Sequence, residues 1–234
     1  MLEITAYASG SSGNCYTVSN GRATIMLDCG LSYGRIGKLT GFIRPDAIFV
    51  THEHNDHIAA AADFMKRGID VYMSQGTMEA AGYEGGHRLH TIRHRESVLI
   101  EDIIISVFDC QHDAAEPLGF LLDDGEDRVL YATDTYYLKY RFPGVTKFMI
   151  ECNHSYEILA ENLAAGTLPK PLEKRLKGSH FSLENLKKFF EANDLSNTKE
   201  IWLIHLSKDN ADPAQFQREI ETLTGLPVYV AKGG

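Results

Sequence analysis

Apolar residues occur along this chain in short runs bounded by glycine, asparagine, aspartate and proline, a pattern that predicts alternating strands and helices. Strands are expected at residues 2–8, 15–19, 23–28, 47–50, 71–73, 97–100, 103–108, 119–122, 129–132, 201–204 and 228–230. Helices are expected at residues 34–42, 58–67, 75–81, 155–165, 183–191 and 214–223. No repeat, low-complexity tract or linker interrupts this pattern, so we expect one domain over residues 1–234.

Composition places the chain among ordinary globular proteins, with 44% hydrophobic and 24% charged residues. No apolar run approaches the roughly 18 residues that a membrane span needs, and the first residues do not resemble a signal peptide. The four cysteines are scattered without a C-x-x-C spacing, at positions 15, 29, 110 and 152. This usage favours reduced thiols in a cytoplasmic protein.

The net charge of −9 is unusual for a protein that grips long nucleic acid by its phosphates. A local basic patch could still serve that purpose, at Lys170, Lys174, Arg175 and Lys177. This patch lies in the region 155–177, where a helix is followed by a Gly-Thr-Leu-Pro break and then the basic stretch. We expect this region to form a lid or a substrate wall, and solvated surface is the simpler alternative.

Four side chains able to bind metals occur within six residues, directly after the apolar run at 47–50. They are His52, His54, Asp56 and His57, in the pattern H-x-H-x-D-H. The predicted strand and helix around them place this loop at the carboxyl end of a strand, where ligands gather in α/β architectures. Imidazoles with one carboxylate suit zinc, manganese or iron. The alternative is a polar loop that happens to be rich in histidine.

Three further metal-capable residues each follow a separate apolar strand: His112, Asp134 and His205. Any one of them alone is more often an ordinary hydrogen-bonded polar residue. Together with the first cluster they complete two coordination shells, and Asp134 is suited to bridge two ions. Cys110 is also near His112, but we expect it to be a buried residue rather than a ligand.

A Ser/Gly-rich turn, Ser9-Gly10-Ser11-Ser12-Gly13-Asn14, follows the first strand. Its backbone amides could cradle an anion, or the turn could be a plain hairpin loop, and the sequence leaves both open. We take Ser11, Ser12 and Asn14 as residues that contact substrate or support the ligands. Asp28 ends the third strand, where it could orient a ligand histidine or cap the turn.

These motifs, in this order, resemble the metallo-β-lactamase superfamily, and within it the WalJ/YycJ group of phosphodiesterases and exonucleases. The phrases that carry the similarity are residues 8–14, 51–57 and 112–114, Glu151-Cys152-Asn153-His154, and His205-Leu206-Ser207 with Asn210. The resemblance implies an α+β fold, an αββα sandwich of two facing mixed β-sheets with outer helices. It also implies metal-dependent phosphodiester hydrolysis, with DNA exonuclease activity attributed to the group.

The resemblance further implies two divalent transition-metal ions, zinc or manganese, and assigns their ligands. His52, His54 and His112 would hold one ion, Asp56, His57 and His205 the other, and Asp134 would serve both. Asp56 thereby also counts as a catalytic residue. Bound metal makes a nucleophile available at neutral pH, and the leaving alkoxide needs a proton donor. His180 is the first candidate for that donor and His154 the second, although either could be a surface or capping histidine.

Several alternatives remain open at this stage. The 70 residues between Asp134 and His205 are too few for the domain that β-CASP nucleases insert, and no arm like that of RNase Z is evident. Because the chain is acidic overall, a small cyclic nucleotide, as in phage anti-defence enzymes, remains an alternative substrate to DNA. A lactonase or thioesterase could use the same metals. A further alternative, from a different functional class, is a non-catalytic binding module in which the metals only stabilise loops. A homodimer is one option for the oligomeric state.

Overall fold

The computed structural model of the protein describes residues 1–231 and divides them into two compact units. The first unit comprises residues 1–109 and 114–128, and the second comprises residues 110–113 and 129–231. A single domain over residues 1–234 stays a prediction, and its last three residues lie outside the described part of the chain.

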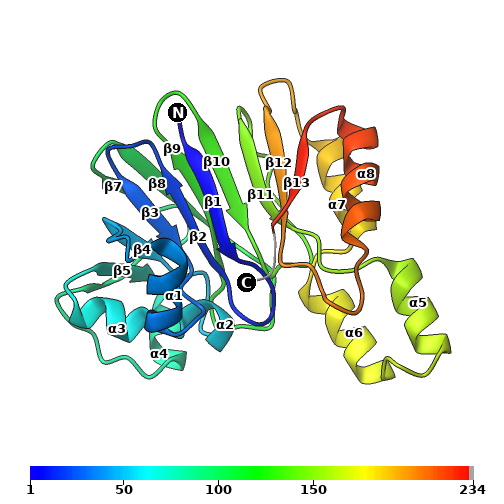
Figure 1. The fold of residues 1–234 in the computed structure, drawn as a ribbon, viewed down its shortest axis with the longest axis horizontal. Coiled ribbons are helices and arrows are strands. Elements are labelled where there is room, and N and C mark those ends of the chain that lie inside the picture. The colour runs from blue at the N-terminus through cyan, green and yellow to red at the C-terminus, as the bar shows by residue number, and fades with distance from the viewer. Residues whose placement is uncertain (232–234) are drawn as a thin grey trace. The chain divides into compact units, whose positions relative to one another are not determined.

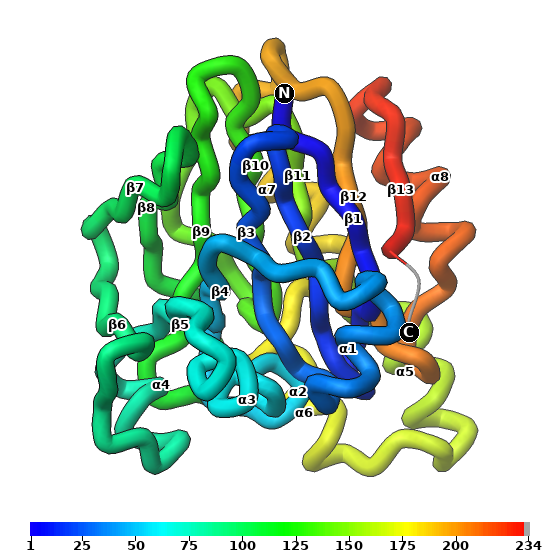
Figure 2. The backbone as a smooth tube through the Cα atoms, turned by 60° about the vertical axis from the view of Figure 1, so that its left-hand side comes forward, coloured from blue at the N-terminus to red at the C-terminus, as the bar shows by residue number. Residues whose placement is uncertain are grey.

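A mixed six-stranded sheet forms the framework of the first unit, with its strands in chain order (Figure 1). These strands are β1 (Glu3–Ala8), β2 (Cys15–Ser19), β3 (Thr24–Leu27), β4 (Ala47–Phe49), β5 (Asp70–Met73) and β6 (Leu89–Thr91). The strands from β1 to β3 pair antiparallel and those from β3 to β6 pair parallel, and Figure 2 shows β1, β2 and β3 side by side. Asn20 closes the β2–β3 hairpin, because its Oδ1 accepts hydrogen bonds from the amides of Arg22 and Ala23 at 3.0 and 2.9 Å.

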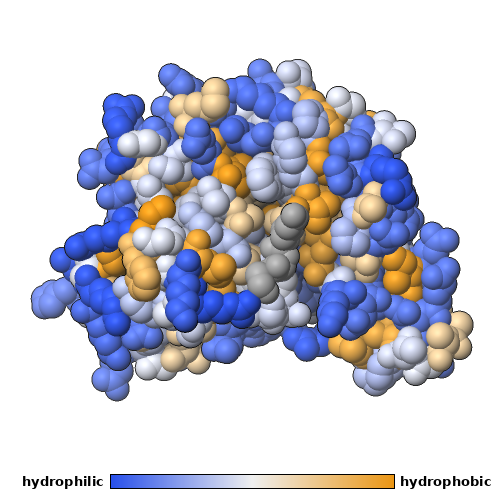
Figure 3. All heavy atoms as spheres, viewed as in Figure 1, coloured by the Kyte–Doolittle hydropathy of each residue, from blue (hydrophilic) through white to orange (hydrophobic). Residues whose placement is uncertain are grey.

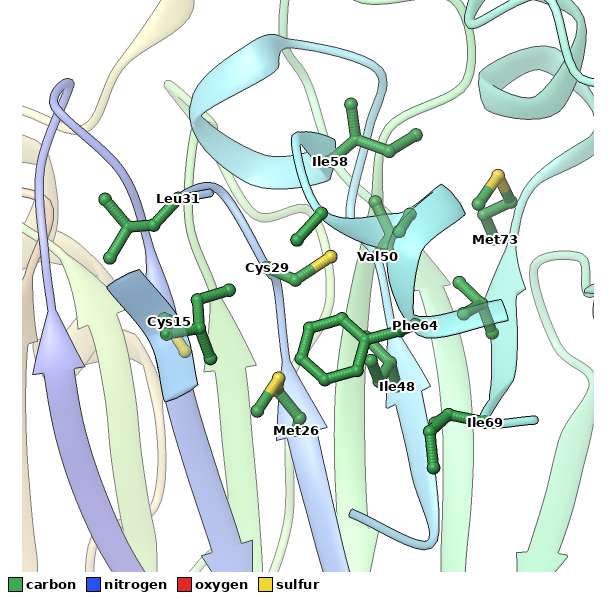
Figure 4. Close-up of a cluster of buried hydrophobic side chains, with 14 of the residues drawn as sticks. Cys15, Met26, Cys29, Leu31, Ile48, Val50, Ile58, Phe64, Ile69 and Met73 are labelled. Atoms are coloured by element: carbon green, nitrogen blue, oxygen red, sulfur yellow. The ribbon is translucent and has the colours of Figure 1, made fainter. Parts of the chain in front are cut away.

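Four short helices belong to the first unit: α1 (Tyr33–Thr40), α2 (Asn55–Ile58), α3 (Ala61–Lys66) and α4 (Gln75–Ala80). Figure 4 shows the buried cluster that joins the sheet to them, with Met26 of β3 and Ile48 of β4 beside Phe64 of α3. Parallel strands covered on both faces need continuous apolar runs, and β4 has one, since all three of its residues are buried. This packing fixes the carboxyl end of β4, where the predicted ligand loop begins.

Seven further strands make up a second mixed sheet. In the first unit, β7 (Ser97–Ile100), β8 (Ile103–Asp109) and β9 (Leu118–Asp123) pair antiparallel in chain order. In the second unit, β10 (Arg128–Ala132), β11 (Lys147–Glu151), β12 (Glu200–Ile204) and β13 (Val228–Val230) pair parallel in chain order. Two mixed sheets with helices confirm the predicted α+β class.

The helices of the second unit are α5 (Tyr156–Ala164), α6 (Lys170–Ser179), α7 (Leu183–Ala192) and α8 (Pro213–Thr224). Helices α7 and α8 lie side by side, and α8 packs on β13 (Figures 1 and 2). Phenylalanines form the core below α7, where the rings of Phe148 and Phe190 meet edge to face at 5.4 Å. Figure 3 shows a small group of hydrophobic side chains at the α5–α6 end of this unit, and Leu172 of α6 is 41% exposed.

The structure differs from the sequence prediction in several elements. Strands β6 and β11 and helix α6 were not predicted. The single helix expected at residues 58–67 is instead the two helices α2 and α3. The break has a local cause, because the amide of Ala60 donates to the carbonyl of Cys29 at 2.9 Å and so leaves the helical ladder.

Two expectations from composition can be compared with the structure. None of the four cysteines forms a disulfide in the described residues, and all four are buried, in agreement with the expectation of reduced thiols. Burial raises the pKa of Cys15 to about 12, so this thiol is unreactive at neutral pH. Within residues 1–231, none of the helices combines the length and the apolar character that crossing a bilayer requires.

Candidate active site

The H-x-H-x-D-H segment of the first unit follows β4 as predicted, but it spans the loop and the first residues of α2, which begins at Asn55 and not at residue 58. His54 is the N-cap residue of α2, with extended backbone, and Asp56 and His57 lie within that helix. The Nε2 atom of His52 lies 3.0 Å from the Nδ1 atom of His54. Two imidazole nitrogens this close are spaced like two ligands of one metal ion, given metal–nitrogen bonds of about 2.0–2.1 Å.

Buried polar groups hold His57 in one orientation. Its Nδ1 donates to Asp28 Oδ2 at 2.8 Å, and both side chains are fully buried. Thr51 Oγ1 lies 3.1 Å from each carboxylate oxygen of Asp28. The Nε2 atom of His57 lies 3.1 Å from the Asn14 amide and 3.4 Å from Asp56 Oδ2. A carboxylate on Nδ1, with Nε2 directed at another candidate ligand, is the usual arrangement of a metal-binding histidine.

The backbone around Gly30 fixes the position of this loop. A Cβ atom on Gly30 would lie 1.6 Å from the carbonyl oxygen of Asp56, so only glycine fits. The amide of Cys29 donates to the carbonyl of His57 at 2.8 Å, and the amide of Asn14 donates to that of Asp56 at 2.8 Å. The ligand loop is therefore tied to both preceding turns by backbone hydrogen bonds.

The Ser/Gly-rich turn supports the ligands through Asn14. This side chain closes the turn, since its Oδ1 accepts from the amide of Gly10 at 2.9 Å, and it also reaches His57. Asn14 is fully buried, whereas Ser11 and Ser12 are exposed. Asn14 therefore lies beside His57, while support of a ligand by Asn14 and substrate binding by the two serines stay predictions.

In the second unit, three neighbouring parallel strands end in polar side chains. Asp134 follows β10, Glu151 is the last residue of β11, and His205 follows β12. Because Ala132 pairs with Ile150 and Glu151 with Ile204, these strands end at the same level. Strand ends in register bring their polar residues together, as is usual for ligand sites in α/β sheets.

These residues are in direct contact. His205 Nδ1 lies 2.7 Å from Asp134 Oδ1 and 2.9 Å from Glu151 Oε1. His112 Nδ1 donates to the carbonyl of Ser179 at 2.9 Å, which directs its Nε2 to within 3.5 Å of Asp134 Oδ2. Burial lowers the pKa of His112 despite the nearby Asp134 carboxylate. A neutral imidazole oriented through Nδ1 is the form that binds metals.

The partly buried His180 and the fully buried Glu151 form a hydrogen-bonded pair. His180 Nδ1 donates to Glu151 Oε1 at 2.6 Å, and the other carboxylate oxygen accepts from the amides of Thr135 and Phe181 at 3.0 and 3.1 Å. Burial alone would raise the pKa of Glu151, but the charge and hydrogen bond of His180, with that of His205, lower it to about 2. Burial alone would lower the pKa of His180, and Glu151 raises it above the usual value. Glu151 therefore favours the protonated form of His180, the form that can donate a proton.

His154 has a different environment. Its side chain is fully buried, and within the described residues neither ring nitrogen has a hydrogen-bond partner. Burial lowers the pKa of His154 to about 4, so its ring is neutral near pH 7. Of the two histidines proposed as proton donor, only His180 has the protonated form stabilised.

Three of the polar residues at strand ends have left-handed backbone conformations: Asp28 (φ 57°), Asp134 (φ 47°) and His205 (φ 53°). Residues other than glycine rarely adopt this region, at a cost of the order of 1–3 kcal/mol each. The conformation turns each side chain away from the alternating directions of its strand. Such strain is common where a chain aims side chains at a functional site.

Glu151 is the residue that sequence reasoning missed, because no role was given to it. It stood in one of the phrases that carry the resemblance, but its strand β11 was not predicted. The available signal was a carboxylate at the end of an apolar run. The apolar runs before Asp134 and His205 end in polar residues in the same way. The donor sets in each unit fit transition metals, since they are rich in imidazole with carboxylates. One such group in the second unit has ligand atoms within 4.8 Å of one another, from Asp134, Glu151, His180 and His205.

Comparison with known proteins assigns the family. The model of the β-lactamase superfamily domain matches residues 24–153. The chain is 32% identical over 225 residues to the exodeoxyribonuclease WalJ of Streptococcus pneumoniae, covering 89% of this chain and 83% of that protein. It is 30% identical over 229 residues to the exodeoxyribonuclease YycJ of Bacillus anthracis, covering 89% and 84%.

A solved structure shows the same fold along the whole chain. The metallo-β-lactamase fold protein YhfI of Bacillus subtilis superposes with a TM-score of 0.77, covering 100% of this chain and 98% of that one at 16% identity. Together with the ligand pattern in each unit, these similarities confirm the resemblance that the sequence motifs indicated. The chain belongs to the metallo-β-lactamase superfamily of metal-dependent hydrolases, in the group that contains WalJ and YycJ.

Proposed function

We propose that this protein is a metal-dependent phosphodiesterase whose substrate is DNA, which it shortens in the manner of an exonuclease. The observation that carries the proposal is the hydrogen bond between His180 and the buried Glu151, at 2.6 Å. Hydrolysis of a nucleic-acid phosphodiester expels an alkoxide, a poor leaving group that needs a proton. The two relatives at 30–32% identity are both named exodeoxyribonucleases, which supports the same chemistry here.

We propose two bound ions, zinc or manganese, with the ligands that the family pattern assigns. His52, His54 and His112 would hold the first ion, Asp56, His57 and His205 would hold the second, and Asp134 would be a ligand of both. The bound ions would supply Lewis acidity towards a phosphoryl group and a nucleophile at neutral pH. The support within each unit is the orientation of the rings. Asp28 and the Ser179 carbonyl hold Nδ1 of His57 and His112, and Nε2 of each ring is directed at a second candidate ligand, Asp56 or Asp134.

In this proposal His180 gives its proton to the leaving oxygen, and Glu151 keeps His180 protonated and correctly turned. Glu151 is fully buried and accepts four hydrogen bonds, so its carboxylate is well fixed. General acid catalysis of this kind contributes typically 10²–10⁴-fold to the rate. Esters with good leaving groups gain little from it.

The exposed cations of α6 favour a polyanionic substrate. Lys170 and Lys174 are exposed on this helix, and its last residue, Ser179, holds His112 and precedes His180. The basic stretch expected to be a lid or a substrate wall is thus a helix that leads into the proposed donor. A small cyclic nucleotide is the second candidate, favoured by the net charge of −9 over the whole chain.

A substrate panel tests the proposal, with the protein loaded with zinc or manganese. The panel contains linear single- and double-stranded DNA, a cyclic mononucleotide, a thioester and a lactone. We expect hydrolysis of linear DNA with release of mononucleotides, and none in the His57→Ala control. Turnover of the thioester or lactone without any phosphodiester would refute the phosphodiesterase. Turnover of the cyclic nucleotide alone would replace DNA by the second candidate.

A further inference from the structure

The second unit contains a pocket that the proposed chemistry does not use. Its volume is about 400 Å³, within the usual range of roughly 300–1,000 Å³ for small-molecule sites. The loop of residues 136–141 forms one wall, and α7 with the preceding Phe181 forms the other. No role has been given so far to any of the side chains that line it.

Aromatic rings dominate the loop wall. Tyr136, Tyr137 and Tyr140 all line the pocket, and Tyr136 and Tyr137 are 38% and 54% exposed. Phe181 and Phe189 line the opposite wall, with their ring centroids 6.1 Å apart. Aromatic faces of this kind stack on nucleobases, because every base has a π-face.

Positive charge accompanies the rings. Lys139, Arg141 and Lys188 line the pocket, and none of its described lining residues is acidic. In a chain with a net charge of −9, three cations that line one pocket make a local field that attracts an anion. Lys139 Nζ also lies 5.2 Å from the ring centroid of Tyr140, so one cation and one stacking surface are presented together.

The loop is fixed rather than loosely attached. Asn193, after α7, accepts from the amide of Phe142 at 3.1 Å and donates to the carbonyl of Phe189 at 2.8 Å. Thr135 Oγ1 donates to the carbonyl of Tyr137 at 2.9 Å. These bonds hold both ends of the loop, so its rings form a surface prepared for a ligand.

The pocket adjoins the candidate active-site residues along the chain. Tyr136 is two residues after Asp134, and its amide donates to the carbonyl of Gln111, beside His112, at 3.1 Å. Phe181 follows His180, and its amide donates to Glu151 at 3.1 Å. Residues that line the pocket are thus fixed to the residues proposed to act on the phosphodiester.

We propose that this pocket binds one nucleotide of a single-stranded nucleic acid, with its base stacked on Tyr136 or Tyr137 and its phosphate near Lys139, Arg141 and Lys188. This inference rests on the proposed function for its consequence in catalysis, since the bound nucleotide would neighbour the cleaved bond. Binding itself is independent of cleavage. The stacking surface reads no base edge, so it gives affinity for single strands without sequence preference.

Fluorescence anisotropy with a labelled oligothymidylate, and with an abasic strand of the same length, tests the binding. Each strand is titrated with the full-length protein in chelator at low salt. The test variant carries Tyr136→Ala and Tyr137→Ala together, and its controls carry Tyr136→Phe with Tyr137→Phe, or Tyr229→Ala on β13, where Tyr229 is 45% exposed. Both pocket tyrosines are exposed, so the alanine variant opens no core.

We expect the alanine variant to bind oligothymidylate about 5- to 150-fold more weakly, the equivalent of about 1–3 kcal/mol for a stacked base. Both control variants should bind oligothymidylate with wild-type affinity. The abasic strand should bind the alanine variant and the wild type with equal affinity. Unchanged affinity for oligothymidylate, or an equal loss on the abasic strand, would overturn the stacking. Lys188→Ala should weaken both strands, and the surface variant Lys66→Ala should weaken neither. An equal loss of affinity in the Lys188→Ala and Lys66→Ala variants would refute the proposed phosphate contact.

Turnover separates this inference from the proposed function. Thymidine 5′-(p-nitrophenyl phosphate) carries a base, and methyl p-nitrophenyl phosphate does not. The alanine variant should raise KM for the thymidine ester by about 5- to 150-fold and leave the methyl ester unchanged. Base-dependent binding without hydrolysis of any phosphodiester would refute the proposed function and support the nucleotide-binding pocket. Hydrolysis with no base-dependent binding would refute the pocket alone.

Discussion

Replacing Glu151 by glutamine tests whether the buried carboxylate is ionised and holds two histidines. The substitution keeps the size of the side chain and removes its charge. Around it the structure places His180 and His205 as donors, the amides of Thr135 and Phe181, and the carboxylate of Asp134 nearby. A neutral amide cannot accept all four hydrogen bonds, and it no longer stabilises a protonated His180.

The size of the effect follows from the pKa of Glu151, which is lowered from 4.5 to about 2. A difference of that size favours the ionised side chain in the folded protein by about 3 kcal/mol. Because the folded-state pKa is the lower one, this stabilisation is fully present above pH 4.5 and is lost as the pH falls towards 2. By pH 3 less than half of the roughly 3 kcal/mol should remain.

Urea denaturation in the presence of a chelator measures the effect, so that metal binding does not contribute. We expect Glu151→Gln to lower the free energy of unfolding at pH 7 by about 3 kcal/mol. The difference in unfolding free energy between the wild type and the variant should decrease as the pH falls from 4.5 to 3. Glu191→Gln, at an exposed position of α7, is the matched control and should behave like the wild type. A gap that is absent at pH 7, or that does not change with pH, would refute an ionised Glu151.

Three further outcomes follow from the same structure. Gly30→Ala should lower the midpoint of thermal unfolding and the metal content together, because its Cβ would lie 1.6 Å from the Asp56 carbonyl; a normal midpoint by calorimetry would contradict the packing. Asp28→Asn should weaken metal binding by about 10- to 100-fold in a chelator competition, since it removes the charge that orients His57, and unchanged affinity would contradict that role. Elemental analysis of the metal-replete protein should give two ions per chain, and Asp134→Ala should lose more metal than either His52→Ala or His57→Ala.

The positions of most candidate metal ligands at strand ends could be predicted from the sequence, because they depend on local order. His52 and His54 lie two residues apart after an apolar run, and the run alone places them at a strand end. Asp134 and His205 follow the same rule. A short apolar run between turn residues forms a strand wherever it is placed, so the sequence suffices for these elements.

Glu151 shows where local reasoning ends. Its strand β11 has only three apolar residues between charged ends, and it is stable because it pairs with β10 and β12 on its two sides. Neither partner is its neighbour in an obvious hairpin, so no local signal predicts the pairing. The hydrogen bonds that Glu151 accepts from His180 and His205 span 29 and 54 residues.

The backbone at Asp28, Asp134 and His205 could not be predicted either. Left-handed conformations are typical of glycine. Asp and His adopt them more often than most other residues, but nothing in the local sequence singles out these three positions. They exist because the surrounding strands and hydrogen bonds hold them there. The split between α2 and α3 has the same origin, since the distant Cys29 carbonyl accepts a hydrogen bond from the amide of Ala60.

The most direct test of the proposed phosphodiesterase compares two leaving groups in the His180→Ala variant. The substrates are a thymidine dinucleotide, which expels a sugar alkoxide, and thymidine 5′-(p-nitrophenyl phosphate), which expels a phenolate that needs no proton. We expect the variant to keep its metal content, to lose about 10²–10⁴-fold in kcat on the dinucleotide, and to retain most activity on the phenyl ester. An equal loss on both substrates, or no loss on either, would contradict proton donation by His180.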